Sequence, residues 1–215
     1  MDNGSPVWRD PGLQYGMIDR AIQFFNAGGW VMYPLLLLSV VGLGIVIERS
    51  LFWTRNSTRR ELGAFRKYAD LMEGNDREIL AAVSSKDGSP IGKLAYWGAS
   101  KKQVSEEAVL ATIELIRPSL DARNGFLSVI VGAAPLLGIL GTVVGIIESF
   151  DLLGQAAGVS DPTIVAGGIA EALYTTAAGL TIALLALFPA SYFKARANAS
   201  LSRLETLGAM LAESD

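Results

Sequence analysis

The chain contains neither cysteine nor histidine among its 215 residues. Without cysteine it can form no disulfide bond and no thiolate metal site. Without histidine it lacks the commonest metal ligand and the usual proton shuttle. Any proton relay must therefore use carboxylates, hydroxyls and water. These absences also exclude Ser/His/Asp and Cys/His catalytic sets, and no G-K-[ST] phosphate loop occurs. We therefore expect a protein that is not an enzyme and uses no metal or cofactor.

Charged residues are scarce as well, at 18% of the chain against 51% hydrophobic residues. A soluble domain usually has about a quarter charged residues. The apolar residues gather in three runs, between Arg20 and Glu48, between Arg123 and Glu148, and from Pro162 to Phe193. Because a bilayer core needs roughly 20 helical residues, each run is long enough to span a membrane. Three helices buried in a soluble core are the alternative, although such helices rarely stay uncharged for so long.

The basic residues predict how the chain is oriented. Of the 18 Lys and Arg residues, 13 lie from Glu48 through Arg123, and none lies from Glu148 to Asp161. By the positive-inside rule, the long middle loop and the C-terminal tail are cytoplasmic, and the N-terminus and the short acidic loop are periplasmic. The first 20 residues have no basic region followed by an apolar stretch, so they predict no cleavable signal.

We therefore predict an all-α membrane protein with three transmembrane helices, of which the second and third extend into a cytoplasmic helical bundle. The predicted segments are a periplasmic N-terminal segment with an interfacial helix at 1–27, transmembrane helix 1 at 28–53, a cytoplasmic helical loop at 54–122, transmembrane helix 2 at 123–150, a periplasmic loop at 151–161, transmembrane helix 3 at 162–193, and a cytoplasmic C-terminal helix at 194–215.

Three features outside the spans predict local structure. Residues 17–25 place their apolar side chains on one helical face, which indicates either a helix on the outer membrane surface or an extension of the first span. Apolar stripes at 62–72 and 109–116 are expected to be packing faces rather than binding sites. Pro118 is expected to kink or interrupt the helix that leads into the second span.

Glu171 is the only charged residue in the third run. A charge at bilayer depth is costly, so such residues face a cavity or a partner and mark functional sites. The alternative is that the span begins later and Glu171 lies at the outer interface. Thr175 follows four residues later on nearly the same face, and Thr142 and Thr176 add two more hydroxyls in the spans. These hydroxyls either orient water in a proton pathway or simply bond to carbonyls of their own helices.

Small residues recur along the second and third runs. Their spacing lets helices approach closely, as expected in a bundle of several subunits. The residues expected at such contacts are Gly138, Gly141, Gly145 and Gly168.

Two sequence motifs occur in order within residues 124–194. The segment APLLGILGTVVGI at 134–146 resembles the second-span motif of the MotA/TolQ/ExbB proton-channel family. The segment GIAEAL at 168–173, followed by TTA at 175–177 and GL at 179–180, resembles its third-span motif, and Pro189-Ala190 fits the end of that span. Glu48-Arg49 at the end of the first run is also typical of the family.

This resemblance implies an ExbB- or TolQ-like subunit of the bacterial inner membrane. It implies a homopentamer with a central pore, a single-span ExbD- or TolR-like partner, and a TonB- or TolA-like protein that receives mechanical work. Glu171, Thr142 and Thr176 match the family's pore-lining polar residues. Thr176 lies about 140° around an ideal helix from Glu171, so Thr175 is the nearer neighbour, and both are kept as candidates. Tyr174 departs from the family pattern, which has an aliphatic residue there.

Other functions remain open from the residues alone. The chain could be a passive membrane scaffold, a small-solute transporter, or a more distant ion-driven stator with another ion or partner. A transporter would commonly show internal repeats, which this sequence lacks. Apart from protein partners, the expected surroundings are the lipid bilayer and not nucleic acid.

Overall fold

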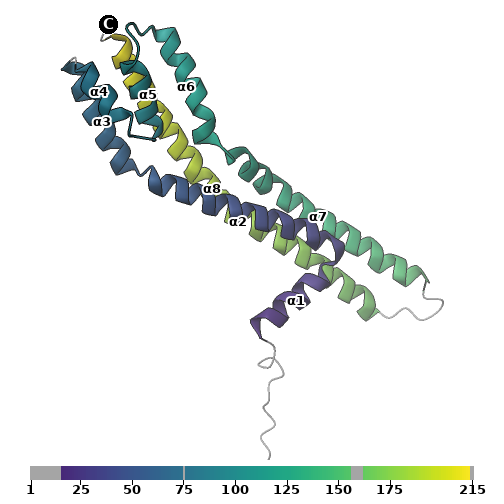
Figure 1. Cartoon of the computed structure of the whole chain (residues 1–215). Coiled ribbons are helices and arrows are strands. Elements are labelled where there is room, and N and C mark those ends of the chain that lie inside the picture. Colours follow the sequence, from purple (N-terminus) through teal and green to yellow (C-terminus); the bar gives the residue numbers. More distant parts are fainter. Residues whose placement is uncertain (1–15, 75, 156–161, 214–215) are drawn as a thin grey trace, which may run out of the picture. The chain divides into compact units, whose positions relative to one another are not determined.

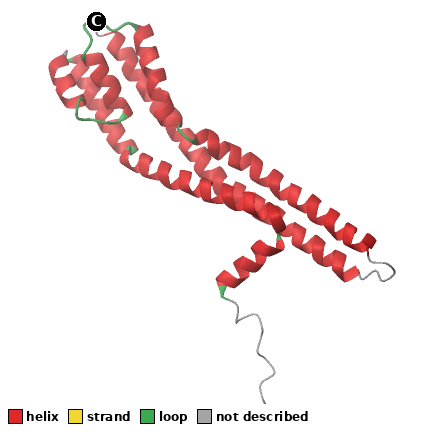
Figure 2. Cartoon of the chain, turned by 45° about the vertical axis from the view of Figure 1, so that its right-hand side comes forward, coloured by secondary structure: helices red, strands yellow, loops and turns green. Residues whose placement is uncertain are grey.

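A computed structural model describes residues 16–74, 76–155 and 162–213. These residues form helices joined by short loops, and no strand occurs among them (Figure 2). The elements are α1 (Met17–Ala27), the 3-10 helix η2 (Gly29–Val31), α2 (Met32–Arg55), α3 (Thr58–Glu73), α4 (Arg77–Ser84), α5 (Pro90–Ala99), α6 (Glu106–Asp121), α7 (Asn124–Gln155) and α8 (Pro162–Glu213). The all-α fold predicted from the sequence is confirmed.

Three of the described helical stretches are long and apolar enough to cross a membrane. They lie within Gly29–Glu73, Asn124–Gly154 and Val165–Glu213. The last belongs to α8, a single helix of 52 residues. At 1.5 Å per residue it is about 78 Å long, well over the roughly 30 Å of a bilayer core. The third apolar run and the polar tail therefore form one uninterrupted helix.

The chain divides into two compact units, and the first consists of Met1–Val40 and Val131–Leu184. Its described part contains α1, η2, the start of α2, most of α7 and the first part of α8. Within this unit α7 and α8 lie side by side (Figure 1). Its apolar core is formed by Val31, Met32, Leu35, Ala134 and Ala183.

The second unit consists of Val41–Ile130 and Leu185–Asp215. It contains α3 to α6, together with the end of α2, the start of α7 and the rest of α8. The predicted stripe at 109–116 packs into its core, where Val109 and Ile113 are buried. A Cβ added at Gly208 of α8 would meet both side chains, so this glycine lets α8 lie close against α6. Of the stripe at 62–72, Met72 is buried and Leu62 is exposed.

Serine residues start three of the helices in the second unit. Ser57, Ser89 and Ser105 each accept a hydrogen bond from the backbone N–H three residues later, at 3.4, 3.1 and 3.3 Å. Such caps satisfy N–H groups that have no partner within the helix. Pro90 follows its cap at the first position of α5, where a missing N–H costs nothing.

The helix that leads into the second span is interrupted, but not at Pro118, the residue expected to kink or interrupt it. Pro118 lies inside α6, which continues to Asp121, so the interruption does not occur at the proline. The chain breaks instead at Ala122 and Arg123, and Arg123 has a φ of 63°. A positive φ is uncommon for a residue with a Cβ. Pro118 removes the hydrogen bond to the carbonyl four residues earlier, yet α6 continues to Asp121, and the left-handed backbone at Arg123 ends the helical path.

The two alternatives for residues 17–25 are also distinguished. α1 ends at Ala27, and Gly28 and Gly29 separate it from the helices that follow. Gly29 has a φ of 63°, a conformation that glycine adopts without steric cost. Figure 1 shows α1 turning away from α2 at this point. α1 is therefore a separate helix, and the alternative that it extends the first span is wrong.

Candidate functional site

The four glycines singled out in the sequence lie where α7 and α8 of one chain touch. A Cβ added at Gly138 would be 2.9 Å from the carbonyl oxygen of Thr175, and one at Gly145 would be 2.7 Å from the Cβ of Ala172. Added atoms at Gly141 and Gly168 would overlap the side chains of Thr175 and Ser149. Because none of these positions has room for a side chain, the two helix backbones can lie close together.

Three threonine hydroxyls occupy this contact. Thr175 is fully buried, and its Oγ1 lies 2.7 Å from the carbonyl oxygen of Ala172 and 3.0 Å from that of Gly138. The Oγ1 of Thr176 lies 3.0 Å from the same Gly138 oxygen and 3.5 Å from Oγ1 of Thr142. The hydroxyl of Thr142 donates to the carbonyl of Ile139 in its own helix, at 2.7 Å. The structure thus brings Thr142 and Thr176 together across the two helices.

Glu171 lies one turn before these hydroxyls on α8. It is exposed in the single chain and makes no hydrogen bond or ion pair within the described residues. It lines a hollow of about 190 Å³. Neither Thr175 nor Thr176 bonds to it, because both hydroxyls point toward Gly138 of α7. The hydroxyls and the carboxylate therefore form adjacent parts of the helix contact rather than one hydrogen-bonded set.

The hollow beside Glu171 has a second carboxylate. Its walls come from α7, α8 and the turn between α1 and α2, and they include Glu148 of α7. From the sequence, Glu148 is expected only at the edge of the acidic periplasmic loop. The sequence spacing does predict this position, because Gly141, Gly145 and Glu148 recur at i, i+4 and i+7 and therefore share one face of α7. The remaining lining residues are Asn26, Gly28, Gly29, Trp30, Val31, Val144, Ser149, Leu152, Gly168 and Ala172.

Tyr174, which departs from the family pattern, lies against α1. Its ring centroid is 5.0 Å from that of Phe24, with the rings tilted by 55°. Aromatic pairs favour such tilted arrangements over face-to-face stacking. The tyrosine therefore helps hold the separate α1 helix against α8 within the first unit.

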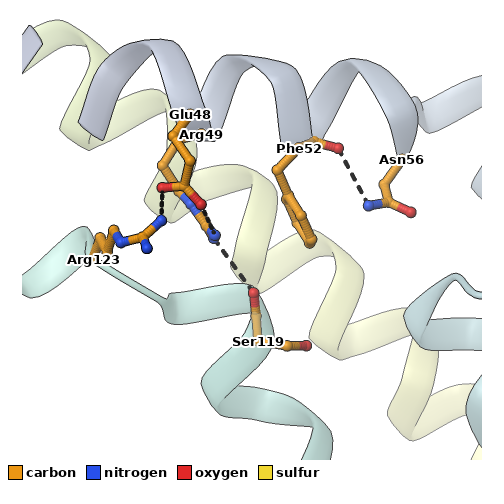
Figure 3. Close-up of polar contacts among 6 residues, drawn as sticks. All are labelled: Glu48, Arg49, Phe52, Asn56, Ser119 and Arg123. Carbon is orange, nitrogen blue, oxygen red and sulfur yellow. Dashed lines mark hydrogen bonds and ion pairs between the residues drawn. The ribbon is translucent and has the colours of Figure 1, made fainter. Parts of the chain in front are cut away.

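A cluster of charged residues lies at the other end of α2 (Figure 3). Glu48 forms ion pairs with Arg49 and with Arg123, and Nη1 of Arg49 donates to the carbonyl of Ser119 at 3.3 Å. Arg49 is 4% exposed, and its guanidinium lies 4.6 Å from the ring centre of Phe52. Buried charges persist when they are paired and hydrogen-bonded in this way. The cluster links α2 to the junction of α6 and α7, where Arg123 has its positive φ.

Comparison with known proteins gives consistent results. Residues 81–206 match the model of the MotA/TolQ/ExbB proton channel family. An ExbB-like biopolymer transport protein of Synechocystis is 33% identical over 177 residues, which cover 78% of this chain and 68% of the relative. The biopolymer transport protein exbB1 of Vibrio cholerae is 29% identical, over 82% of this chain and 80% of its own. An ExbB homologue of Methanothermobacter thermautotrophicus is 29% identical over 214 residues, which cover 95% of this chain and 73% of the relative.

Proposed function

Because the chain belongs to the MotA/TolQ/ExbB proton channel family, we propose that it is the channel-forming subunit of a proton-driven motor in the bacterial inner membrane. The motor would convert the proton motive force into mechanical work on a TonB- or TolA-like envelope protein. An ExbD- or TolR-like protein with one span would be its second component. This proposal rests on family membership, on the three candidate spans and on the surroundings of Glu171.

Glu171 is the observation that carries the proposal. It is a carboxylate in an otherwise uncharged apolar stretch, it has no cation partner within the described residues, and it borders a hollow. A carboxylate at bilayer depth is expensive unless it performs a function there. The unpaired carboxyl group can take up a proton and release it, whereas one fixed in an ion pair with Arg or Lys would be held in its charged form.

The threonines beside Glu171 supply the groups that a proton pathway needs. A hydroxyl both donates and accepts hydrogen bonds, so it can orient water molecules in a narrow passage. Thr142 and Thr176 are half-buried and only 3.5 Å apart. We assign these two to the pathway. Thr175 is fully buried against α7 and bonded to backbone carbonyls, so we assign it to packing.

A ring of subunits would shelter Glu171 better than a single chain does. The side chain is exposed in the single chain, as are large apolar neighbours on both helices, among them Ile139 and Val143 of α7 and Leu173 and Leu180 of α8. Apolar surface of this extent faces lipid or another subunit. A homopentamer with α7 and α8 around a central pore would enclose the carboxylate and leave other faces to lipid.

The replacement Glu171→Gln tests this function in cells. Gln has nearly the same shape but cannot titrate, so membrane insertion and assembly should be retained while work driven by the proton motive force is lost. Glu205→Gln, an exposed residue of the same helix, is the matched control and should behave like the wild type. Energy-dependent uptake or envelope integrity is measured at equal membrane levels of each variant. A passive scaffold would keep its function in both variants.

A further inference from the structure

A hollow of about 230 Å³ lies in the second unit, apart from the residues assigned to the proton pathway. Its walls come from the end of α2, the start of α3, the start of α5 and the distal part of α8. The lining residues are Trp53, Arg55, Asn56, Arg60, Glu61, Ala64, Asp87, Ser89, Pro90 and Ser200.

The two carboxylates in this hollow already have partners. Glu61 is buried, forms an ion pair with Arg203 at 2.9 Å and accepts a hydrogen bond from Ser200. Asp87 accepts from the hydroxyl of Tyr68 at 2.7 Å and from the backbone N–H of Ser89 at 3.0 Å. Burial opposes ionisation of Asp87, but these hydrogen bonds outweigh it and hold its pKa below the usual value. Glu61 is thus paired with a cation, and Asp87 is held by two neutral donors.

Some side-chain donors in and beside this hollow have no partner among the described residues. Neither Arg55 nor Arg60 forms an ion pair within the part of the chain that the structure describes. Trp53 is 4% exposed, and its indole N–H is buried without an acceptor there. Beside the hollow, the guanidinium of Arg196 lies 5.0 Å from the Trp53 ring centre; its Nη2 donates to the carbonyl of Asn56 at 3.0 Å, whereas its Nε–H lacks an acceptor among the described residues. Buried donors are normally hydrogen-bonded, so this surplus favours an anionic ligand.

The start of α5 also lines the hollow, but it is already capped within the chain. The carboxylate of Asp87 accepts from the backbone N–H of Ser89, and the hydroxyl of Ser89 accepts from that of Gly92. Pro90, at the first position of the helix, has no N–H to offer. The preference for a ligand with negatively charged oxygens therefore comes from the guanidinium groups and the indole N–H.

The position of the hollow along α2 indicates the source of those oxygens. Trp53 is the last residue of the predicted first span, and Arg55 lies about 3 Å further along the helix axis. Trp is enriched at the level of the lipid headgroups, and basic pockets on the cytoplasmic side bind anionic headgroups. We propose that this hollow binds the phosphate group of an anionic phospholipid from the cytoplasmic leaflet.

The experiment is lipid titration of the full-length protein in detergent, followed by native mass spectrometry. Phosphatidylglycerol should bind in preference to phosphatidylethanolamine. Arg60→Gln should weaken phosphatidylglycerol binding about five-fold, the effect expected for one basic residue near an anionic lipid. Arg55→Gln should act similarly. Arg59→Gln removes the same charge from the adjacent, exposed residue outside the hollow, so it is the matched control and should change binding little.

Three outcomes would overturn this assignment. Equal weakening by Arg59→Gln and Arg60→Gln would mean that the lipid is held by the general positive charge of the surface. Equal affinity for phosphatidylethanolamine would remove the preference for a net negative headgroup. Displacement of the lipid by inorganic phosphate at similar concentration would identify free phosphate as the ligand. Unfolding temperatures of all variants without lipid should match the wild type, so that lost binding is not lost folding.

Discussion

Thr175 and Thr176 are adjacent in the sequence, yet their side chains have different surroundings. Thr175 is fully buried between carbonyls of both helices, whereas Thr176 is half-buried and reaches Thr142. From the sequence, Thr175 was the nearer neighbour of Glu171 by helical position. Helical position gives only the rotation within α8; it does not include α7, whose glycines allow both hydroxyls to approach Gly138. Neighbours across a helix contact decide which of two adjacent hydroxyls is free for water.

Thr175→Val tests the packing assignment. The change keeps the volume but removes a buried hydroxyl with two acceptors nearby, and should lower the free energy of unfolding by about 1–2 kcal/mol. Thr181→Val is the control, because Thr181 is exposed and bonds only to Ala177 in its own helix. The measurement is thermal unfolding of the purified protein in detergent. Equal destabilisation by the two substitutions would contradict the assignment.

Glu148 is the residue whose place beside Glu171 emerged from the structure. Because the two carboxylates line one hollow, we expect Glu148 to help pass protons to Glu171. Glu148→Gln should reduce proton-driven activity several-fold without abolishing it, since water in the hollow can still reach Glu171. Asp151→Asn changes an acidic residue one turn further along α7 that does not line the hollow. Activity in cells would be compared at matched expression, and indistinguishable effects of the two substitutions would rule out a role for Glu148.

At the level of elements, the sequence predicts which segments form the membrane helices, but it does not predict how these helices contact one another. Apolar runs and their lengths predict the membrane helices, because hydrocarbon solvates only helices with few charges. The break at Arg123 was missed, since the proline five residues earlier is the stronger local signal. Arg123 also forms an ion pair with Glu48 on α2, a contact between residues far apart in the sequence that no local signal reveals.

The α7–α8 contact yields a second stability prediction. Gly145→Ala places a methyl group 2.7 Å from the Cβ of Ala172, so the helices must separate locally. We expect a loss of about 1–3 kcal/mol, as for other overpacked contacts. Gly132→Ala is the matched control in the same helix, because a Cβ there meets nothing within 4 Å and alanine favours helix formation. A fall in unfolding temperature for Gly145→Ala alone would agree with the contact, whereas equal behaviour would contradict it.

For the whole molecule, the sequence predicts both the family and the topology, but only the family has been tested. The motifs at 134–146 and 168–180 identified the MotA/TolQ/ExbB family, and the match over residues 81–206 confirms it. The orientation rests on the distribution of Lys and Arg alone. Subunit number and partners depend on surfaces of other chains, so they stay proposals.

The topology can be measured directly because the natural chain has no cysteine. Gly154 lies at the end of α7 and Gly88 lies between α4 and α5, and both are exposed with open space around them. The variants Gly154→Cys and Gly88→Cys therefore place one reactive thiol on each side of the predicted membrane. In intact cells permeable at the outer membrane, a membrane-impermeant thiol reagent should label the cysteine at position 154 only. After disruption of the inner membrane it should label both. Labelling at position 88 alone in intact cells would reverse the assigned orientation.

The central claim is that Glu171 carries the proton, and proton flux tests it most directly. The chain would be reconstituted with the proposed ExbD- or TolR-like partner in vesicles containing a pH-sensitive dye, and a potassium diffusion potential would drive protons inward. We predict that Glu171→Gln lowers the flux to the level of empty vesicles while the complex remains assembled, and that Glu205→Gln leaves it unchanged. Wild-type flux through the Glu171→Gln complex would contradict the account.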